Sequence, residues 1–365
     1  MKFLSILIKP VSGMCNIDCK YCFYKEIALY PGKCARMSDE VMKKLIDRAL
    51  ETEADEILFA FQGGEPLLAG AEYYRDFIKY VSENNKSSKI AYSVQTNGML
   101  INDEYVEIFK ENNFLVGISI DGPKFVHDKY RLKYDGNGTY ENVISNAKKL
   151  MNAGVEVNVL SVITGEGALK AKKIYEFYKK NGFYFTQFIP CMDPINEVQG
   201  SGENALTTDK YYTFLSELFE LWYEDFMSGE YISIRHFDNW VRMVMGERSD
   251  MCSLTGVCGS YFVCESDGNI YPCDFYVSSK YLLGNIVTDS FEHLFKSLNE
   301  SGFLKEAAVC LSPECKECKN FDLCRGGCKR DWVRDGNTGK SRYCSALDRF
   351  FNRYRSKMLQ IASVL

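Results

Sequence analysis

The sequence predicts an α/β fold in which a partial barrel of parallel strands and helices precedes a smaller, cysteine-rich region. Short apolar runs typical of strands recur through the first half of the chain, and amphipathic stretches separate them. The strand-like runs begin near Phe3, Glu56, Lys89, Phe114, Val155 and Tyr184. Six strand–helix units in succession imply a parallel sheet with outer helices. Right-handed crossovers would curl this sheet into a partial (β/α)6 barrel of the TIM type.

The predicted helices carry start and stop signals. Ser38 and Asn102 are N-cap residues, and acidic residues follow each of them in the first turn. Apolar residues at helical spacing between residues 143 and 151 indicate another helix, which Gly154 ends. Further along, Asp267-Gly268 predicts the turn of a hairpin. The last stretch, residues 345–365, predicts an amphipathic helix.

Composition and charge exclude several classes of protein. The chain has 365 residues, 46% of them hydrophobic, which suffices for one large core with or without a satellite domain. A net charge of −5 predicts no general attraction to nucleic acid or anionic membranes. The apolar run Phe3–Ile8 is too short for a signal peptide, and we interpret it as the first strand. No run approaches a membrane span, so we expect a cytoplasmic protein.

The spacing of three cysteines after the first strand indicates an iron–sulfur site. Cys15, Cys19 and Cys22 form a Cys-x3-Cys-x2-Cys pattern. Three thiolates on one loop can bind three irons of a 4Fe–4S cluster and leave the fourth iron without a protein ligand. An open metal position is what catalysis requires. The chain has 15 cysteines, and at this length metal ligation is more plausible than a disulfide framework.

A glycine-rich turn, Phe61-Gln62-Gly63-Gly64-Glu65-Pro66, follows the second predicted strand. Its two glycines allow a ligand to approach the backbone, and their amides can bind a carboxylate. Glu65 offers a negative charge to an ammonium group. The alternative is an ordinary strand-to-helix turn in which Pro66 begins the helix.

Together these two motifs resemble the radical S-adenosylmethionine superfamily. The resemblance implies that the fourth iron chelates the amino and carboxylate groups of S-adenosylmethionine, and that Gly63, Gly64 and Glu65 bind its methionyl amino group. It implies further cofactor contacts from Tyr24, Asn97, Ser119, Arg131 and Met192. Taken singly, Asn97 and Ser119 could equally be turn formers. The lone His127 is interpreted as structural.

Cysteines of the last third resemble the extension called the SPASM domain, which carries two auxiliary 4Fe–4S clusters. The resemblance assigns Cys252, Cys258, Cys273 and Cys328 to the first cluster and Cys315, Cys318, Cys324 and Cys344 to the second. Four ligands close each site, which suits electron transfer or structure. The alternative is one or two zinc sites. The cysteines left over, interpreted as buried apolar residues or free thiols, are Cys34, Cys191, Cys264 and Cys310. The predicted domains are a barrel, residues 1–230, and a SPASM domain, residues 231–365, which includes the C-terminal helix.

Within this superfamily the chain most resembles the anaerobic sulfatase-maturating enzymes, and Pro272-Cys273-Asp274-Phe275-Tyr276 is the most discriminating run. The resemblance implies oxidation of a cysteine or serine in a sulfatase peptide to Cα-formylglycine, with three 4Fe–4S clusters and S-adenosylmethionine as cofactors. A 5′-deoxyadenosyl radical would abstract a Cβ hydrogen, and Asp274 would accept the thiol or hydroxyl proton. Alternatively, Asp274 hydrogen-bonds the backbone beside a cluster. The candidate substrate contacts are Gln62, Asp193 and Arg235, with Asp193 meeting an arginine of the peptide.

Two other functions compete with this interpretation. A SPASM enzyme that crosslinks a ribosomal peptide would share the clusters, but many such enzymes carry a peptide-recognition domain before the cluster loop, which begins here at Cys15. A non-enzymatic electron carrier would need neither the α/β scaffold nor the Gly-Gly-Glu turn. We therefore expect an enzyme with a sulfatase polypeptide as substrate and a flavodoxin or ferredoxin as reductant. We expect no nucleic-acid or membrane partner.

Overall fold

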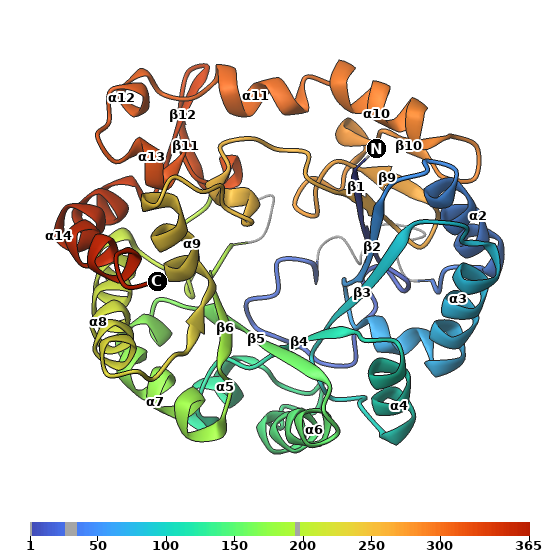
Figure 1. Cartoon of the computed structure of the whole chain (residues 1–365), viewed down its shortest axis with the longest axis horizontal. Helices are drawn as coiled ribbons and strands as arrows, with labels where there is room; N and C mark the ends of the chain where they lie inside the picture. The colour runs from blue at the N-terminus through green and yellow to red at the C-terminus, as the bar shows by residue number, and fades with distance from the viewer. Residues whose placement is uncertain (1, 26–34, 194–197) are drawn as a thin grey trace. The chain divides into compact units, whose positions relative to one another are not determined.

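The computed structural model describes residues 2–25, 35–193 and 198–365. Contacts divide the chain into two compact units, each built from segments far apart in sequence (Figure 1). Unit 1 comprises Met1–Ile120, His127–Asn158 and Gly259–Phe303, and unit 2 comprises Asp121–Val126, Val159–Cys258 and Leu304–Leu365. The boundary expected after residue 230 falls inside unit 2, and the division into a barrel and a SPASM domain stays a prediction.

The sheet of unit 1 is mainly parallel. Its parallel strands are β1 (Phe3–Ile8), β2 (Glu56–Phe61), β3 (Lys89–Thr96), β4 (Leu115–Ser119) and β8 (Phe262–Cys264). The short strands β9 (Asn269–Tyr271) and β10 (Gly284–Asn285) add antiparallel pairs, and the order is β10-β9-β8-β1-β2-β3-β4. The predicted starts of the first three strands are confirmed, as is the hairpin β8–β9 turned at Gly268. The fourth strand begins one residue later than predicted.

Helices α2 (Asp39–Leu50), α3 (Ala71–Asn84) and α4 (Asp103–Glu111) lie on the outer side of these strands (Figure 1). Alternate residues of β2 are buried because successive side chains of a strand point to opposite faces. Phe59 and Phe61 of β2 pack edge-on against Phe77 of α3, with both pairs of ring centroids 5.1 Å apart. This aromatic packing holds the carboxyl end of β2 in place. It therefore also positions the glycine-rich turn that follows the strand.

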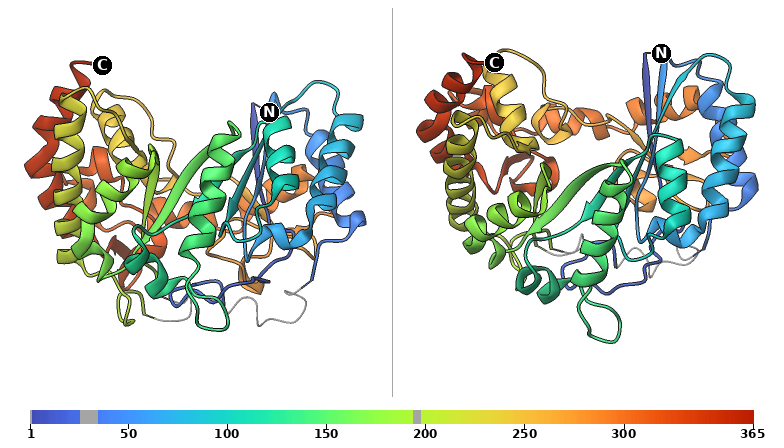
Figure 2. Two further views of the ribbon diagram at one scale, coloured as in Figure 1. Left: turned by 90° about the horizontal axis from the view of Figure 1, so that it is seen from below. Right: turned by 60° about the horizontal axis from the view of Figure 1, so that its bottom comes forward.

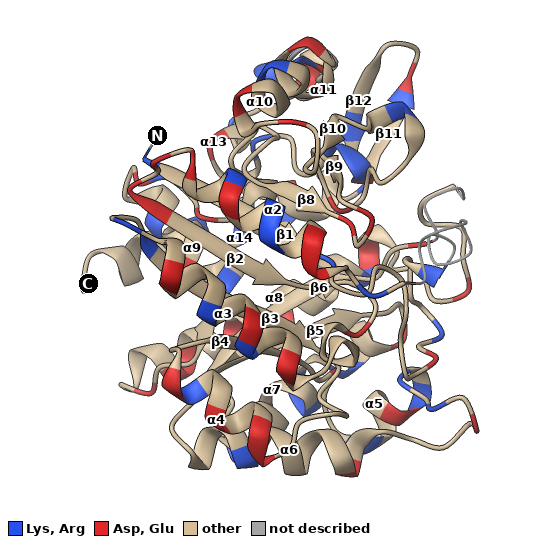
Figure 3. Cartoon of the chain, turned by 90° about the vertical axis from the view of Figure 1, so that its right-hand side faces the viewer, with Lys and Arg blue, Asp and Glu red and all other residues tan. Residues whose placement is uncertain are grey.

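The expected helix starts of unit 1 are present. Ser38 Oγ accepts from the Val41 amide at 3.2 Å, and Asn102 Oδ1 accepts from the Tyr105 amide at 3.0 Å. The remaining long helices of this unit are α6 (Tyr140–Asn152) and α10 (Phe291–Glu300). Figure 3 shows both signs of charge along α3, α4 and α6, and Lys149 of α6 lies 2.7 Å from Asp103 of α4.

Unit 2 contains three parallel strands and a helical core. Its strands are most of β5 (Glu156–Ile163), β6 (Phe185–Pro190) and β7 (Ser233–Ile234), and its long helices are α7 (Ala171–Asn181), α8 (Thr208–Met227), α9 (Arg235–Val244) and α14 (Cys344–Ala362). Helix α14 confirms the predicted C-terminal helix, and it lies alongside α8 (Figure 2). Phe350 of α14 packs against Phe219 of α8 and Trp240 of α9, with ring centroids 5.5 and 5.2 Å away.

The remaining elements are short. They are α5 (Lys124–Tyr130), α11 (Phe303–Val309), α12 (Pro313–Lys316), α13 (Phe321–Cys324), β11 (Trp332–Asp335), β12 (Thr338–Ser341), and the 3-10 helices η1 (Pro66–Ala69), η2 (Gly167–Lys170), η3 (Cys252–Leu254), η4 (Ser279–Tyr281) and η5 (Lys329–Asp331). Within the described ranges, no helix is both long and apolar enough to cross a membrane.

Candidate active site

The three-cysteine loop follows β1. Cys15, Cys19 and Cys22 form no disulfide and are partly exposed, and the Cys22 amide donates to the Cys19 carbonyl at 3.2 Å. Asn97, directly after β3, places its Nδ2 3.7 Å from Cys15 Sγ. Arg131 places its Nη1 3.9 Å from Cys19 Sγ. Two residues predicted to bind the cofactor therefore lie beside the cysteines.

The ligands of a 4Fe–4S cluster are arranged differently from those of a single metal ion. Among the residues that the structure describes, no three His, Cys, Asp or Glu side chains gather as ligands of one metal ion. A 4Fe–4S cluster binds each thiolate at a different iron, so its ligands do not converge on one point. Burial raises the pKa of Cys15 to about 11. Its thiol therefore stays protonated at neutral pH until a metal displaces the proton.

The glycine-rich turn is docked against this loop. The Glu65 amide donates to the Met14 carbonyl at 2.7 Å. Gly64 has φ of +51°, and a Cβ at this position would lie 2.0 Å from the same carbonyl oxygen. Any larger residue at position 64 would push the turn away from the loop. The two motifs, separate in sequence, are thus adjacent in the fold.

The Glu65 carboxylate is buried and hydrogen-bonded. It accepts from the amides of Leu67 at 3.1 Å and Asn97 at 2.7 Å, and from Thr96 Oγ1 at 2.7 Å. The Leu67 bond caps η1, so the turn also has the helix-starting role that we considered as the alternative. Burial raises the pKa of Glu65 to about 7 in spite of these donors. A carboxylate so destabilised gains from an added cation, which is the property that binding an ammonium group requires.

Asp274 lies in a buried polar cluster of unit 1. Its carboxylate forms an ion pair with Lys9, and the two side chains are 5% and 1% exposed. Gln62 Nε2 lies 3.4 Å from Asp274 Oδ2. The Tyr24 ring lies 3.5 Å from Lys9 Nζ, and its hydroxyl donates to Glu265. Gln62 and Tyr24, predicted to contact substrate and cofactor, therefore both lie at the Lys9–Asp274 pair.

Sequence reasoning missed two charged members of this cluster, Lys9 and Glu265, both fully buried. Each directly follows a buried strand, β1 and β8, and these strands pair in parallel. Their position in the sequence could have identified them. A charged residue that immediately follows an apolar strand of a parallel sheet lies at the edge of the sheet where ligands bind.

The other candidates of unit 1 have local partners. Ser119 Oγ lies 3.0 Å from Gln95 Nε2. His127 is fully buried, and its Nε2 lies 2.9 Å from Thr139 Oγ1. This burial and hydrogen bond agree with the structural role expected of the histidine.

In unit 2, Met192 and Asp193 follow β6 and are buried. The Asp193 carboxylate accepts from the Gly200 amide, and the Gln199 side chain bonds both the amide and the carbonyl of Asp193 at 3.2 and 3.0 Å. The carboxylate therefore holds its own loop together in addition to any role towards a substrate.

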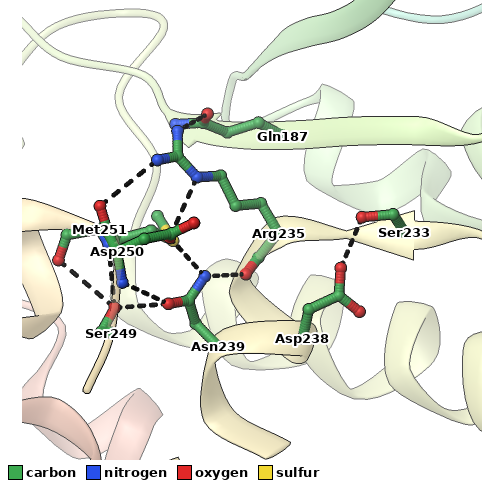
Figure 4. A network of polar contacts seen from close by, with 8 residues as sticks. All are labelled: Gln187, Ser233, Arg235, Asp238, Asn239, Ser249, Asp250 and Met251. Atoms are coloured by element: carbon green, nitrogen blue, oxygen red, sulfur yellow. Dashed lines mark hydrogen bonds and ion pairs between the residues drawn. The ribbon is translucent and has the colours of Figure 1, made fainter. Parts of the chain in front are cut away.

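Arg235 begins α9 and joins a polar network (Figure 4). Its Nη1 donates to Gln187 Oε1 at 2.9 Å, and its Nε lies 3.4 Å from Asp250 Oδ1. Asn239 Nδ2 donates to the same Asp250 oxygen at 2.8 Å. The guanidinium, predicted to contact substrate, thus also holds the segment that leads to Cys252.

The cysteines assigned to the second auxiliary cluster all belong to unit 2 and are free; they are Cys315, Cys318, Cys324 and Cys344. Burial, and then the charges of the other three, raises the pKa of Cys324 to about 11. Four thiols that influence one another in this way fit a cluster with four protein ligands.

The first auxiliary set is divided between the units: Cys252, Cys258 and Cys328 belong to unit 2 and Cys273 to unit 1. Burial raises the pKa of Cys252 to about 11, and the charges of Cys328 and Cys258 act in the same direction. Of the cysteines left over, Cys191 and Cys264 are buried and Cys310 is partly buried, as expected. Cys34 lies outside the described residues.

Comparison with known proteins agrees with these motifs. Residues 10–193 match the model of the Radical SAM superfamily, and residues 252–326 match SPASM, an iron–sulfur cluster-binding domain. The chain is 40% identical to a cysteine-type anaerobic sulfatase-maturating enzyme of Clostridium novyi, over 100% of this chain and 99% of that one. It is 30% identical to a serine-type enzyme of Bacteroides thetaiotaomicron, over 96% of this chain and 89% of that one.

A solved structure described as native anSMEcpe with bound AdoMet and Kp18Cys peptide superposes with a TM-score of 0.95 at 39% identity, covering 100% of both chains. The predicted α/β fold with a C-terminal SPASM domain is thereby confirmed. The chain belongs to the radical SAM superfamily and, within it, to the anaerobic sulfatase-maturating enzymes.

Proposed function

We propose that this chain oxidises a side chain of a sulfatase polypeptide to Cα-formylglycine. The observation that carries the proposal is full-length similarity to sulfatase-maturating enzymes together with a buried Asp274 beside Gln62. A cysteine is the proposed target, because identity is 40% to a cysteine-type relative and 30% to a serine-type one.

In this proposal the residues around the cysteine loop hold the cofactors. Cys15, Cys19 and Cys22 hold the catalytic 4Fe–4S cluster, and Glu65 accepts the amino group of S-adenosylmethionine. When bound, these cofactors supply the 5′-deoxyadenosyl radical that takes a hydrogen from the substrate Cβ. The further proposed contacts are those of Gly63, Gly64, Tyr24, Asn97, Ser119, Arg131 and Met192. The assignments of the two auxiliary clusters rest on the SPASM resemblance.

Asp274 accepts the proton of the substrate thiol. Loss of that proton, together with one electron that an auxiliary 4Fe–4S cluster would accept, converts the Cβ radical to a thioaldehyde, and water hydrolyses the thioaldehyde to the aldehyde with release of hydrogen sulfide. Gln62, through Nε2, orients the Asp274 carboxylate and lies where the substrate side chain arrives. A base held in place contributes about 10²–10⁴-fold to a rate. Asp193 and Arg235 are proposed to contact the peptide farther from the reacting carbon.

The proposed reductant is a flavodoxin or ferredoxin, which delivers single electrons to the clusters. The proposed setting is the cytoplasm, and neither nucleic acid nor membrane takes part. A net charge of −5 is in keeping with this, since it provides no general attraction to polyanions.

The test is anaerobic incubation of the reconstituted protein with S-adenosylmethionine, a reductant and a peptide carrying the Cys-x-Pro-x-Arg sulfatase signature. Conversion of cysteine to formylglycine removes about 18 mass units, with 5′-deoxyadenosine formed alongside. Asp274→Asn should lower the yield about 10²–10⁴-fold while deoxyadenosine still forms. Asp103→Asn, at an exposed side chain of α4, is the matched control. Deoxyadenosine without any change in the peptide would contradict the sulfatase assignment and leave the radical enzyme standing.

A further inference from the structure

Lys9 is an unusual lysine because it is fully buried. Lysine is almost never fully buried unless its charge is paired, since removing an ammonium group from water is costly. Lys9 directly follows β1, where its amide donates to the Cys264 carbonyl at 2.8 Å and its carbonyl accepts from the Ser12 amide at 3.1 Å. The backbone of the residue is therefore held on both sides, and the direction of its side chain is fixed.

The surroundings of Lys9 are built for its side chain. Gly63 has φ of +101°, and a Cβ at this position would lie 2.8 Å from Cγ and Cδ of Lys9. Because glycine has no side chain, position 63 leaves room for the aliphatic part of the Lys9 side chain. At its end, the ammonium group meets the Tyr24 ring at 3.5 Å and the Asp274 carboxylate. An aromatic face and a carboxylate together stabilise a desolvated cation.

The hydrogen bonds around the pair keep it in one arrangement. Tyr24 donates its hydroxyl to Glu265, which also accepts from Ser12 Oγ. The ring therefore cannot rotate away from the ammonium group without losing a buried hydrogen bond.

We propose that Lys9 is the positioning residue for Asp274, pairing with its buried carboxylate and holding it beside Gln62 for the substrate thiol. Without the ammonium group, Asp274 would be a buried charge lacking its counter-ion, and it would leave this position. The inference rests on the proposed function, because the role of Asp274 as the base belongs to that proposal. It adds that Asp274 acts as the base only when it is paired with Lys9, the residue that follows β1.

The test is a double-mutant cycle with Lys9→Met, Asp274→Asn and the two combined, which isolates the coupling between the residues. Lys9→Met should lower kcat for formylglycine about 10²-fold, with KM for the peptide changed less than about 3-fold and deoxyadenosine still formed. The combined variant should lose no more than the worse single variant. Lys149→Met, which removes an exposed lysine paired with Asp103, is the control and should match the wild type.

Thermal unfolding gives a readout that does not depend on turnover. Lys9→Met should lower the midpoint by about 5–10 °C, and adding Asp274→Asn should restore part of that loss, because the unpaired buried charge is removed. A crystal structure of Lys9→Met should show the Asp274 carboxylate away from Gln62 Nε2.

Several results would overturn the inference. Full formylglycine activity in Lys9→Met, losses that multiply in the combined variant, or an unmoved Asp274 carboxylate would each contradict it. A wild-type protein that cleaves S-adenosylmethionine but never alters the sulfatase peptide would overturn the proposed function and this inference together. An active wild type with an equally active Lys9→Met overturns the inference alone.

Discussion

Two cysteine regions of this chain differ in what surrounds them. Around the loop of Cys15, Cys19 and Cys22 lie side chains that can bind a ligand, including Asn97 and the buried Glu65. Of the set that ends at Cys344, Cys315 lies in α12, Cys318 lies between α12 and α13, Cys324 ends α13, and Cys344 begins α14. The buried face of α14 includes Phe350, Phe351 and Tyr354. Three thiols with polar neighbours match the open cluster that we propose for the first region, and four thiols match the closed cluster that we propose for the second.

The largest expected effect separates the two regions by function. Cys19→Ala should abolish cleavage of S-adenosylmethionine, by at least about 10³-fold, because the open cluster loses a ligand. Cys318→Ala should keep cleavage with a chemical reductant within about 10-fold and lose only the iron of one cluster. For both variants, chromatography of 5′-deoxyadenosine measures the cleavage of S-adenosylmethionine, and iron analysis measures how many clusters remain. Equal loss of cleavage in both would show that the second set is not a separate, closed site.

The next effect tests whether packing supports the second region. Phe350 is fully buried between α8 and α9. Phe350→Ala should lower the free energy of unfolding by about 3–5 kcal/mol, through lost burial and the cavity left behind. When the Phe350→Ala variant is heated, the cluster of Cys315, Cys318, Cys324 and Cys344 should lose its iron before the cluster of Cys15, Cys19 and Cys22 does. Iron release followed optically alongside circular dichroism measures this, and simultaneous release would contradict it.

Glu65 tests the polar neighbours of the first region. Glu65→Gln should weaken binding of S-adenosylmethionine about 10–100-fold, since a charge-assisted hydrogen bond to an ammonium group is worth about 1.5–3 kcal/mol. Equilibrium binding to the reconstituted protein measures it. Binding within about 2-fold of the wild type would leave Glu65 with only its capping role.

The same residue predicts a pH dependence. Burial raises the pKa of Glu65 from 4.5 to about 7, so between these values the folded chain binds more protons than the unfolded chain. Its contribution to stability therefore falls as pH rises through this window, by at most about 3 kcal/mol, and is constant above it. Urea unfolding of the cluster-free wild type and Glu65→Gln at several pH values should show a flatter profile in the variant. Parallel profiles would contradict the assigned pKa.

The smallest effect concerns Arg235. Its ion pair with Asp250 joins side chains that are 42% and 54% exposed, so Arg235→Gln should cost less than about 1 kcal/mol in urea unfolding. Arg242→Gln is the control, because Arg242 also lies on α9 and forms a similarly exposed pair with Glu247, which follows the helix. A much larger loss for Arg235 would mean that it holds the segment before Cys252 more firmly than its exposure suggests.

Much of the candidate site could be predicted from local patterns. The three-cysteine spacing and the Gly-Gly-Glu turn are short motifs whose chemistry depends on residue type and spacing, whereas the role expected of Asp274 came from the resemblance to the sulfatase-maturating enzymes. The strand starts and the caps at Ser38 and Asn102 followed from hydrophobic periodicity and side-chain hydrogen bonding within one turn.

The partners of those residues could not be predicted in the same way. Gln62 and Asp274 are 212 residues apart in sequence, and Ser12 and Glu265 are 253 apart. No local pattern connects them, because they meet only after β8 adds to the edge of β1. For the same reason the sequence did not predict that Gly259–Phe303 belongs to unit 1 while the segments before and after it belong to unit 2.

The sequence by itself determined the strands and helices, the two cysteine regions and the class of chemistry, since each depends on side chains close together along the chain. Only the tertiary structure decided that Lys9 pairs with Asp274, that Gly63 makes room for the lysine stem, and that Glu65 is buried enough for its pKa to reach about 7. Burial and pairing depend on which distant segments exclude water from a charged group, and that is a property of packing rather than of order along the chain.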